Sequence, residues 1–429
     1  MWTTRTLGDI CDDVDGVIQT GPFGSQLHES DYVANGVPVV MPKNILDGKI
    51  DTSDIAFIRQ EDADRLHRHK MTLGDIVYGR RGDIGRRGLI GERENGWFCG
   101  TGCLRVGLGD RVLDPRYLYY YLGQPSVVSW IANQAVGATM PNLNTGILRS
   151  VVITYPRLPV QQRIGSILSA YDDLIENNTR RITLLEQMAQ MIYREWFVNF
   201  RFPGHENVRM VESELGPIPE GWRSGILRDV CESLDYGYTV SATYEPIGPR
   251  FLRITDIVPS VIDWQRVPYC PPPETSADKY TLREGDIVVA RTGATTGYAK
   301  RLNKRHPASI FASYLVRLRI KAGFSNHLFG VLVESDEYKR FIKANWSGAA
   351  QPQANAQVLT SIPILMSPEP LQRQFSEMVE PLLDLKEALH FKNLALRTTR
   401  DFLLPKLISG EVPVEAADET AAELMGQSA

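Results

Sequence analysis

The sequence predicts an α+β protein in which a globular domain of mixed strands and short helices, followed by a long helix, occurs twice. Two observations support this prediction. The chain contains two long stretches with helical spacing of apolar residues. The second stretch repeats the first at a fixed offset, and most of the remaining chain repeats with it. Repetition of so long a unit indicates internal duplication, with the two copies related by a pseudo-two-fold.

The first long helix is expected over residues 158–200. Its apolar residues recur at alternating steps of three and four, which places them in one stripe, and no proline interrupts the stretch after Pro159. About 40 residues at ~1.5 Å each make a rod of roughly 60 Å, and such a rod needs a partner to cover its stripe. The stripe comprises Val160, Ile164, Ile167, Tyr171, Leu174, Ile182, Leu185, Ala189, Ile192 and Trp196.

The second long helix is expected over residues 369–410 and supplies that partner. Its apolar positions lie 211 residues after those of the first helix, so that Leu371 matches Val160 and Phe375 matches Ile164. The two helices are therefore predicted to pack together as a coiled coil.

Each globular part is expected to contain mostly strands, because β-branched and aromatic runs are bounded by Gly, Pro and Asp. The same 211-residue offset joins Asp75-Ile76-Val77 to Asp286-Ile287-Val288, and the segment 137–144 to 348–355. Strands are expected at 37–41, 76–78, 151–155, 251–254, 287–289 and 314–320, and helical spacing at 114–135 and 327–344.

These patterns predict six segments in chain order. They are a first globular domain at 1–157, a first long helix at 158–200, a linker at 201–221, a second globular domain at 222–368, a second long helix at 369–410, and a disordered acidic tail at 411–429.

Composition excludes several classes of protein. A net charge of −4 argues against a uniformly basic nucleic-acid coat, and 43% hydrophobic residues are ordinary for globular protein. There is no apolar run of about 18 residues and no basic-then-apolar leader, so a cytoplasmic protein is expected. The 5 scattered cysteines favour reduced thiols over a disulfide framework.

Signatures of catalysis are absent from the sequence. There is no phosphate-binding G-x4-G-K-[ST] loop, no dinucleotide-binding G-x-G-x-x-G and no G-x-S-x-G elbow. Cys99 and Cys103 lack the second pair of ligands typical of a zinc site. His67 and His69 lie in a charged run and are expected on a solvated face. No metal site and no cofactor of the chain's own are therefore predicted.

A basic, Gly-rich loop follows the same strand in each copy. One such loop is more often a solubilising surface loop, but basic loops at matching places favour contact with a nucleic-acid backbone or groove. Amide, hydroxyl and aromatic residues flank them. The predicted DNA-binding residues are Ser25, Gln26, Arg80, Arg81, Arg86, Arg87, Tyr238, Thr239, Arg291, Thr292, Thr295, Thr296 and Lys300.

Comparison of the two loops separates shared from divergent positions. Asp75 and Asp286, like Arg80 and Arg291, are shared, so they are expected to hold the fold or contact phosphate in both copies. The segment 83–87 differs from 294–297, and these divergent residues are expected to read different bases.

With these motifs in order twice, the chain resembles the specificity (S) subunit of type I restriction-modification systems. The resemblance rests on GDI-x-x-x-R-x-G in both copies, the GATMPNLN and GAAQPQAN loops, LGPIPEGW, and the helix starts LPVQQRI and EPLQRQF. It covers about residues 1–412. It implies two target-recognition domains separated by two antiparallel helices, which together recognise a bipartite DNA site.

The resemblance also implies a division of labour between subunits. Methylation would belong to separate modification subunits, of which two are expected, and these would carry S-adenosylmethionine and flip the target adenine. Cleavage would belong to restriction subunits. The outer faces of the helices, with Arg180, Arg181, Glu186 and Glu195, would dock modification subunits.

Two other hypotheses remain at this stage. A stand-alone methyltransferase or nuclease would require a cofactor or metal motif that the sequence lacks. The other is a protein adaptor that binds no DNA and whose helices mediate assembly only.

One further prediction concerns the helix register. Asn178 and Asn393 each lie on or near an apolar seam, and antiparallel helices aligned end to end bring these two amides together. Facing amides can satisfy each other and penalise slipped registers. The alternative is that both point to solvent at the edge of the seam.

Overall fold

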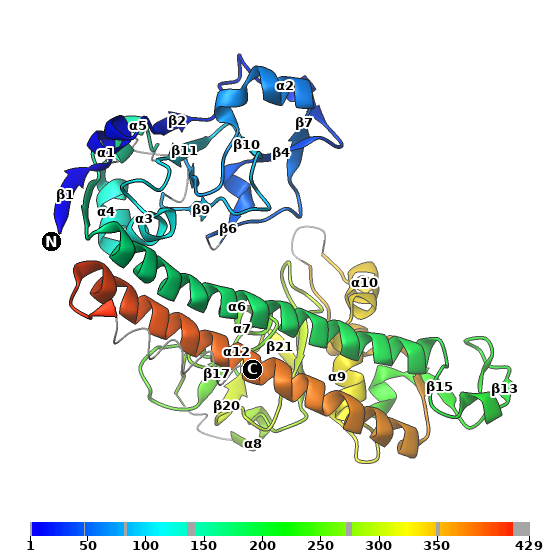
Figure 1. The fold of residues 1–429 in the computed structure, drawn as a ribbon. Coiled ribbons are helices and arrows are strands. Elements are labelled where there is room, and N and C mark those ends of the chain that lie inside the picture. Colours follow the sequence, from blue (N-terminus) through cyan, green and yellow to red (C-terminus); the bar gives the residue numbers. More distant parts are fainter. Residues whose placement is uncertain are drawn as a thin grey trace. The chain divides into compact units, whose positions relative to one another are not determined.

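The computed structural model describes residues 2–46, 48–80, 84–134, 142–271, 277–348 and 352–414. The chain forms two compact units: unit 1 comprises Met1–Glu176 and Leu394–Ala429, and unit 2 comprises Asn177–Asn393. Each unit contains one globular part and segments of both long helices (Figure 1).

Unit 1 is built around a four-stranded antiparallel sheet in the order β2-β11-β8-β9. A second sheet, β10-β4-β7-β3, and the pairs β1-β12 and β5-β6 complete its strands. The bounds are β1 Thr3–Thr6, β2 Val17–Thr20, β3 Tyr32–Val33, β4 Val37–Val40, β5 Ile45–Leu46, β6 Lys49–Ile50, β7 Ala56–Ile58, β8 Ile76–Gly79, β9 Arg87–Leu89, β10 Phe98–Cys99, β11 Cys103–Gly107 and β12 Val152–Tyr155. The helices are α1 Leu7–Asp13, α2 Gln60–Arg65, α3 Pro115–Tyr121, α4 Pro125–Gln134 and α5 Thr145–Arg149.

Unit 2 repeats the central sheet in the order β16-β21-β18-β19, with the pairs β17-β20, β15-β22 and β13-β14. Its strands are β13 Met210–Val211, β14 Ile218–Pro219, β15 Arg223–Ile226, β16 Cys231–Tyr236, β17 Arg250–Leu252, β18 Ile287–Ala290, β19 Ala299–Arg301, β20 Ser309–Phe311, β21 Leu315–Ile320 and β22 Pro363–Met366. Its helices are α7 Ile254–Ile257, α8 Ala277–Tyr280, α9 Asn326–Glu334, α10 Asp336–Asn345 and α11 Ala356–Thr360.

The strand registers confirm that the two globular parts are copies of one fold. In unit 1 Val77 lies opposite Arg105, and in unit 2 Val288 lies opposite Arg317. The central strands β8 and β18 are buried at every position, because side chains cover both faces of each sheet. This explains the continuous apolar runs in the sequence.

The long helices have nearly the expected bounds. α6 spans Leu158–Tyr193 and continues as a π-helical turn over Arg194–Val198, whereas α12 spans Glu369–Ser409. Within unit 2, the second part of α6 and the first part of α12 lie side by side (Figure 1).

The predicted antiparallel register is confirmed by three contacts. In unit 2, Asn178 Nδ2 donates to Asn393 Oδ1 at 2.9 Å, and both residues are buried. Trp196 lies 6.1 Å from Phe375 in the same unit. In unit 1, Asp172 pairs with Arg400. The amides therefore face each other instead of pointing to solvent.

Two predicted helical stretches are each two helices. The described part of the stretch predicted at 114–135 forms α3 and α4, because Pro125 lacks the N–H that would continue the ladder. Residues 327–344 fall in α9 and α10, and Ser335 begins the second by accepting from Tyr338 N at 3.1 Å. The predicted strand 251–254 also ends early, at Leu252.

A buried glutamine near the start of each long helix fixes it to the adjoining globular part. Gln161 Oε1 accepts from Asp114 N at 2.9 Å, and Gln372 Oε1 accepts from Ser325 N at 2.9 Å. Asp114 and Ser325 are the N-caps of α3 and α9. Because the repeat preserves this contact, the same helix-to-domain joint is present in both units.

The predicted linker and tail pack more tightly than expected. The linker forms the β13-β14 hairpin, and its Phe202 stacks on Trp222 with ring centroids 5.5 Å apart. At the other end of the chain, Val414 is buried in the core of unit 1. Most of the predicted disordered tail, 415–429, lies outside the described residues.

Candidate nucleic-acid interface

The basic loop of unit 2 leaves the end of β18 and is held by internal hydrogen bonds. Thr296 Oγ1 donates to Gly293 O at 2.7 Å, and Gly297 N donates to Ala290 O at 2.8 Å. Gly293 has φ +81° and Gly297 φ +90°, so glycine is required for this turn. The loop is therefore a defined structure and not a loose surface segment.

The same loop is attached to the second shared motif of the repeat. Gly293 N donates to Pro352 O at 2.9 Å, Ala354 N donates to Arg291 O at 2.9 Å, and Thr292 forms a bridge with Gln353. The two motifs that recur in the sequence are thus in direct contact.

Unit 1 makes the matching attachment. Leu143 N donates to Arg80 O at 2.9 Å, as Ala354 N does to Arg291 O. Asn144 then caps α5 by accepting from Ile147 N at 2.9 Å, and Asn355 caps α11 in the same way. The shared asparagines therefore begin helices, which explains their recurrence.

The shared aspartates directly precede β8 and β18, at the strand ends opposite these loops, and serve the fold. Asp75 accepts from Thr72 N at 2.7 Å and from Arg105 Nε at 2.6 Å. Asp286 accepts from Arg283 N and Arg319 in unit 2. Burial raises the pKa of Asp75. These contacts favour the fold-holding role among the two that the sequence allowed.

A glycine in each copy brings a further segment to the same edge of the sheet. A Cβ on Gly21 would lie 2.0 Å from Gly100 O, and one on Gly237 would lie 2.2 Å from Ala312 O. No side chain fits at either place. The chain therefore passes close to the neighbouring backbone before presenting Phe23 in unit 1 and Thr239 in unit 2, both exposed.

These segments form one edge in each unit, which we name the DNA-facing edge because predicted DNA-binding residues lie on it. It consists of the end of β2 or β16, the end of β8 or β18, the start of β11 or β21, and the attached loop at 142–144 or 352–355. Of the predicted residues, Ser25, Arg86 and Thr239 are exposed, and Arg80, Arg291, Thr292 and Thr295 are partly exposed.

Some predicted residues are engaged within the protein. Arg87 Nε donates to Tyr119 O at 2.9 Å, and Thr296 is buried in its own turn. Lys300 pairs with Glu334 at 3.0 Å. We therefore remove these three from the DNA-facing edges, because their polar groups already have partners.

Two other predicted residues have side chains occupied by local contacts. Gln26 Oε1 accepts from Phe23 N at 3.2 Å, and Tyr238 lies 5.1 Å from the Tyr280 ring. Arg81 lies outside the described residues.

Tyr314 and Tyr236 are not among the predicted DNA-binding residues. Both are exposed, at 60% and 40%, and both lie at the DNA-facing edge of unit 2. Tyr314 O accepts from Arg291 N at 3.0 Å, where unit 1 uses Gly102 O. The sequence signal that could have identified Tyr314 is its difference from Gly102, the equivalent residue beside the shared arginine in unit 1.

The histidine and cysteine predictions have separate outcomes. The expected solvated face is wrong for His69, which is 1% exposed; burial lowers its pKa to about 4. All cysteines are buried free thiols, as expected. Across the described ranges, no group of three or more His, Cys, Asp or Glu side chains is placed to hold a metal.

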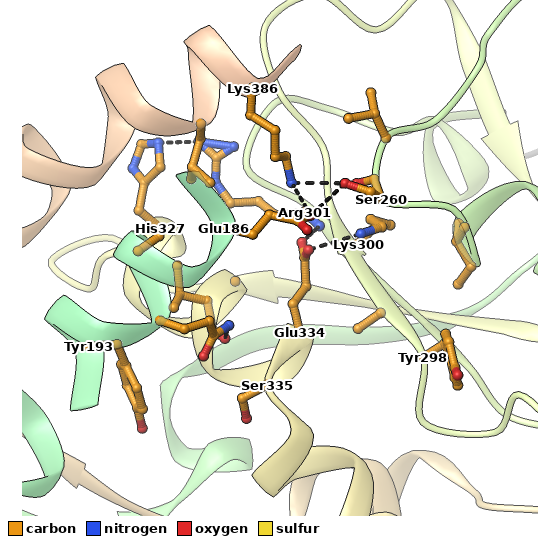
Figure 2. Close-up of a pocket in the computed structure, with 18 of the residues that line it drawn as sticks. Glu186, Tyr193, Ser260, Tyr298, Lys300, Arg301, His327, Glu334, Ser335 and Lys386 are labelled. Carbon is orange, nitrogen blue, oxygen red and sulfur yellow. Dashed lines mark hydrogen bonds and ion pairs between the residues drawn. The ribbon is translucent and has the colours of Figure 1, made fainter. Parts of the chain in front are cut away.

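A cavity of about 560 Å³, lined by several charged residues among others, lies within unit 2 and is bordered by α6, β19, α9 and α12 (Figure 2). Glu186, predicted to dock a partner, pairs with Lys386 at 3.1 Å. Lys300 and Lys386 lower the pKa of Glu334 although burial opposes them. Burial lowers the pKa of His327, which contacts Arg301, to about 4.

An apolar stripe is exposed on α6 in unit 2. Leu184, Met188 and Met191 are 51%, 46% and 62% exposed. Their spacing places them on one helix face. At the position equivalent to Met191, α12 carries Phe402, which is 61% exposed in unit 1.

Comparison with known proteins agrees with this architecture. The family model described as "Type I restriction modification DNA specificity domain" matches residues 1–187. The MjaIX specificity subunit of Methanocaldococcus jannaschii is 27% identical over 70% of this chain and 69% of its own length. The MjaVIII specificity subunit of the same organism is 22% identical over 90% of this chain and 91% of its own.

A solved structure shares the fold. The S subunit of a type I restriction-modification system from M. genitalium aligns with a TM-score of 0.60 and 15% identity over 95% of this chain and 96% of its own. Within the described residues, no helix is long and apolar enough to cross a membrane. The family model and these relatives all indicate a type I restriction-modification specificity subunit.

Proposed function

We propose that this chain reads a bipartite DNA site, with each unit contacting one block of bases through its DNA-facing edge. The observation that carries the proposal is the pair of matching edges. Both have the same backbone framework, yet they expose different side chains: Phe23, Ser25 and Arg86 in unit 1, and Tyr236, Thr239 and Tyr314 in unit 2. Two copies of one domain that share a framework but expose different residues are suited to recognise two different DNA sequences.

The chain acts, in this proposal, without catalysis of its own. The absence of catalytic signatures from the sequence supports this division, which leaves methylation to modification subunits that carry S-adenosylmethionine. Restriction subunits would supply cleavage. Purified chain alone is expected to show no methylation, nuclease or ATPase activity.

The exposed apolar stripe on α6 supports docking of a modification subunit. Leu184, Met188 and Met191 present three large apolar side chains on one helix face, and a facing helix could bury them as a coiled-coil seam. Phe402, at the position equivalent to Met191, supports docking of a second modification subunit on unit 1. Two modification subunits per chain are therefore proposed.

The proposal is tested by DNA binding with and without modification subunits across a range of salt. We expect sequence-specific binding by the complex, weakening steeply as salt rises because counterions are released from phosphates. The variant Met188→Glu should prevent docking of one of the two modification subunits, whereas Glu176→Gln, an exposed change on the same helix, should leave both in place. Assembly without DNA binding under any condition would instead support the protein adaptor.

A further inference from the structure

Arg80 and Arg291 occupy the same place in the repeat and have the same backbone contacts. Each follows the last residue of a central strand. Each donates its N–H to the neighbouring strand segment, at 2.8 Å to Gly102 O and at 3.0 Å to Tyr314 O. Each accepts from the attached loop, at Leu143 N or Ala354 N. The main chain therefore gives them identical surroundings.

Their side chains have different partners. Arg80 Nε donates to Leu143 O at 3.1 Å, so this guanidinium helps to hold the attached loop against the strand end. The guanidinium of Arg291 instead lies over the ring of Tyr236, 5.0 Å from its centroid. Its Nε is buried and has no hydrogen-bond partner among the described residues.

Tyr236 explains this difference. It ends β16 opposite Val316, where unit 1 has Thr20 opposite Leu104. The Tyr236 hydroxyl accepts from Ala356 N at 3.1 Å, at the start of α11. In unit 2 a tyrosine thus ties strand end to attached loop, and the arginine side chain is not needed for that task.

The resulting geometry suits contact with an acceptor outside the protein. A guanidinium remains charged at all relevant pH values and carries five donors in a planar fork. Stacking on an aromatic ring restricts the fork while leaving its terminal nitrogens available. Arg291 is partly exposed; its guanidinium lies over the ring of the exposed Tyr236, and its backbone N–H donates to the carbonyl of the exposed Tyr314. Phosphate oxygens and the O6 and N7 atoms of guanine are the DNA acceptors that match such a fork.

We infer that the two arginines have different roles: Arg291, oriented by Tyr236, contacts DNA directly, whereas Arg80 is a positioning residue that acts through the loop at 142–144. This inference rests on the proposed function and deepens it. It also separates two residues that the sequence alone treats as equivalent.

The test uses the complete complex with modification subunits and compares Arg291→Ala with Arg80→Ala. For Arg291→Ala we expect one of two results. Loss of a phosphate contact would weaken binding to all sequences and reduce the salt slope by about 0.9. Loss of a base contact would reduce discrimination at one base pair of the second block by about 5- to 150-fold.

Arg80→Ala serves as the matched comparison. It should leave the salt slope and the reading of the second block unchanged, while lowering the thermal stability of unit 1 and weakening recognition of the first block. Arg291→Lys keeps the charge but not the fork, so it should rescue a phosphate contact and fail to rescue a base contact. Tyr236→Phe keeps the ring under Arg291 and should retain the wild-type salt slope and base preference.

Three outcomes would overturn the inference. The first is an Arg291→Ala complex with wild-type slope and wild-type base preference, and the second is an equal change of slope in both alanine variants. In either case the wild-type complex still binds its site, so the proposed function survives. Failure of the wild-type complex to bind any DNA is the third outcome, and it overturns the proposed function as well.

Discussion

The two units attach their globular parts to the long helices through one shared contact and one divergent region. The shared contact is the buried glutamine, Gln161 in unit 1 and Gln372 in unit 2. Beyond it, unit 1 places the hydroxyl of Tyr120 against Asp172, which also pairs with Arg400. Unit 2 has the smaller residues Gly330, Val331 and Leu332 at 330–332, where unit 1 has tyrosines at 119–121.

Unit 2 fills the corresponding space with charged groups around its cavity (Figure 2). The Arg301 side chain lies against Gly330, where a Cβ would approach Arg301 Cδ to 2.9 Å. Nearby, Lys300 pairs with Glu334 and Lys386 with Glu186. A duplicated unit thus keeps the contact that starts its helix. The neighbouring contacts can diverge, provided that each buried charge has a partner.

The largest expected effect breaks the shared contact. Gln372→Leu leaves Ser325 N and Ser367 O without their buried partner, and each unpaired group costs about 1–3 kcal/mol. We therefore expect unit 2 to lose about 2–6 kcal/mol of unfolding free energy in denaturant titrations. Gln161→Leu should have a similar effect in unit 1.

The chain offers matched controls for both glutamines. Gln162 and Gln374 lie on the same helices but are exposed, so their leucine variants should stay within about 0.5 kcal/mol of wild type. Equal effects of the buried and exposed substitutions would contradict the role given to the joint.

A smaller effect is expected at the helix seam. Asn178→Leu removes the 2.9 Å hydrogen bond to Asn393 Oδ1 and should cost about 1–3 kcal/mol. The double variant Asn178→Leu/Asn393→Leu should cost less than the sum of the single variants, because both amides are removed together. Asn177, exposed beside them, provides the control. Additive losses in this double-mutant cycle would argue against coupling of the pair.

The smallest expected effect concerns acid sensitivity in unit 2. The pKa of Glu334 is lowered in the folded chain, so its stabilising contribution is present above its ordinary pKa of 4.5 and is lost as pH falls through the lowered value. In Glu334→Gln, the unfolding free energy of unit 2 should therefore fall less than in the wild type as the pH is lowered. Glu337→Gln, an exposed change nearby, should leave the wild-type profile. If Glu334→Gln keeps the wild-type dependence of stability on pH, this carboxylate does not contribute to the acid sensitivity of unit 2.

The sequence was sufficient for the features that depend on periodicity and repetition. The two long helices, their register and the Asn178–Asn393 contact follow from the apolar spacing and the constant offset. An antiparallel pair has one register that aligns both ends, so a single assumption determined which residues face each other.

Features that depend on tertiary neighbours were not predictable in this way. Lys300 appeared available because the loop around it contains no acid, yet Glu334, far along the chain on α9, lies beside it. Gln372 was visible in the helix-start motif, but its burial against the α9 N-cap was not. Arg80 and Arg291 look alike in sequence, but in unit 2 Tyr236 ties the strand end to the attached loop and carries the Arg291 guanidinium on its ring.

The central claim is that each DNA-facing edge reads its own block of bases. The most direct measurement replaces residues 291–298 with the matching loop from another specificity subunit and maps methylated sites by methylation-sensitive sequencing of host DNA. The account predicts a bipartite site in which only the second block changes. A change in both blocks, or in neither, would contradict it.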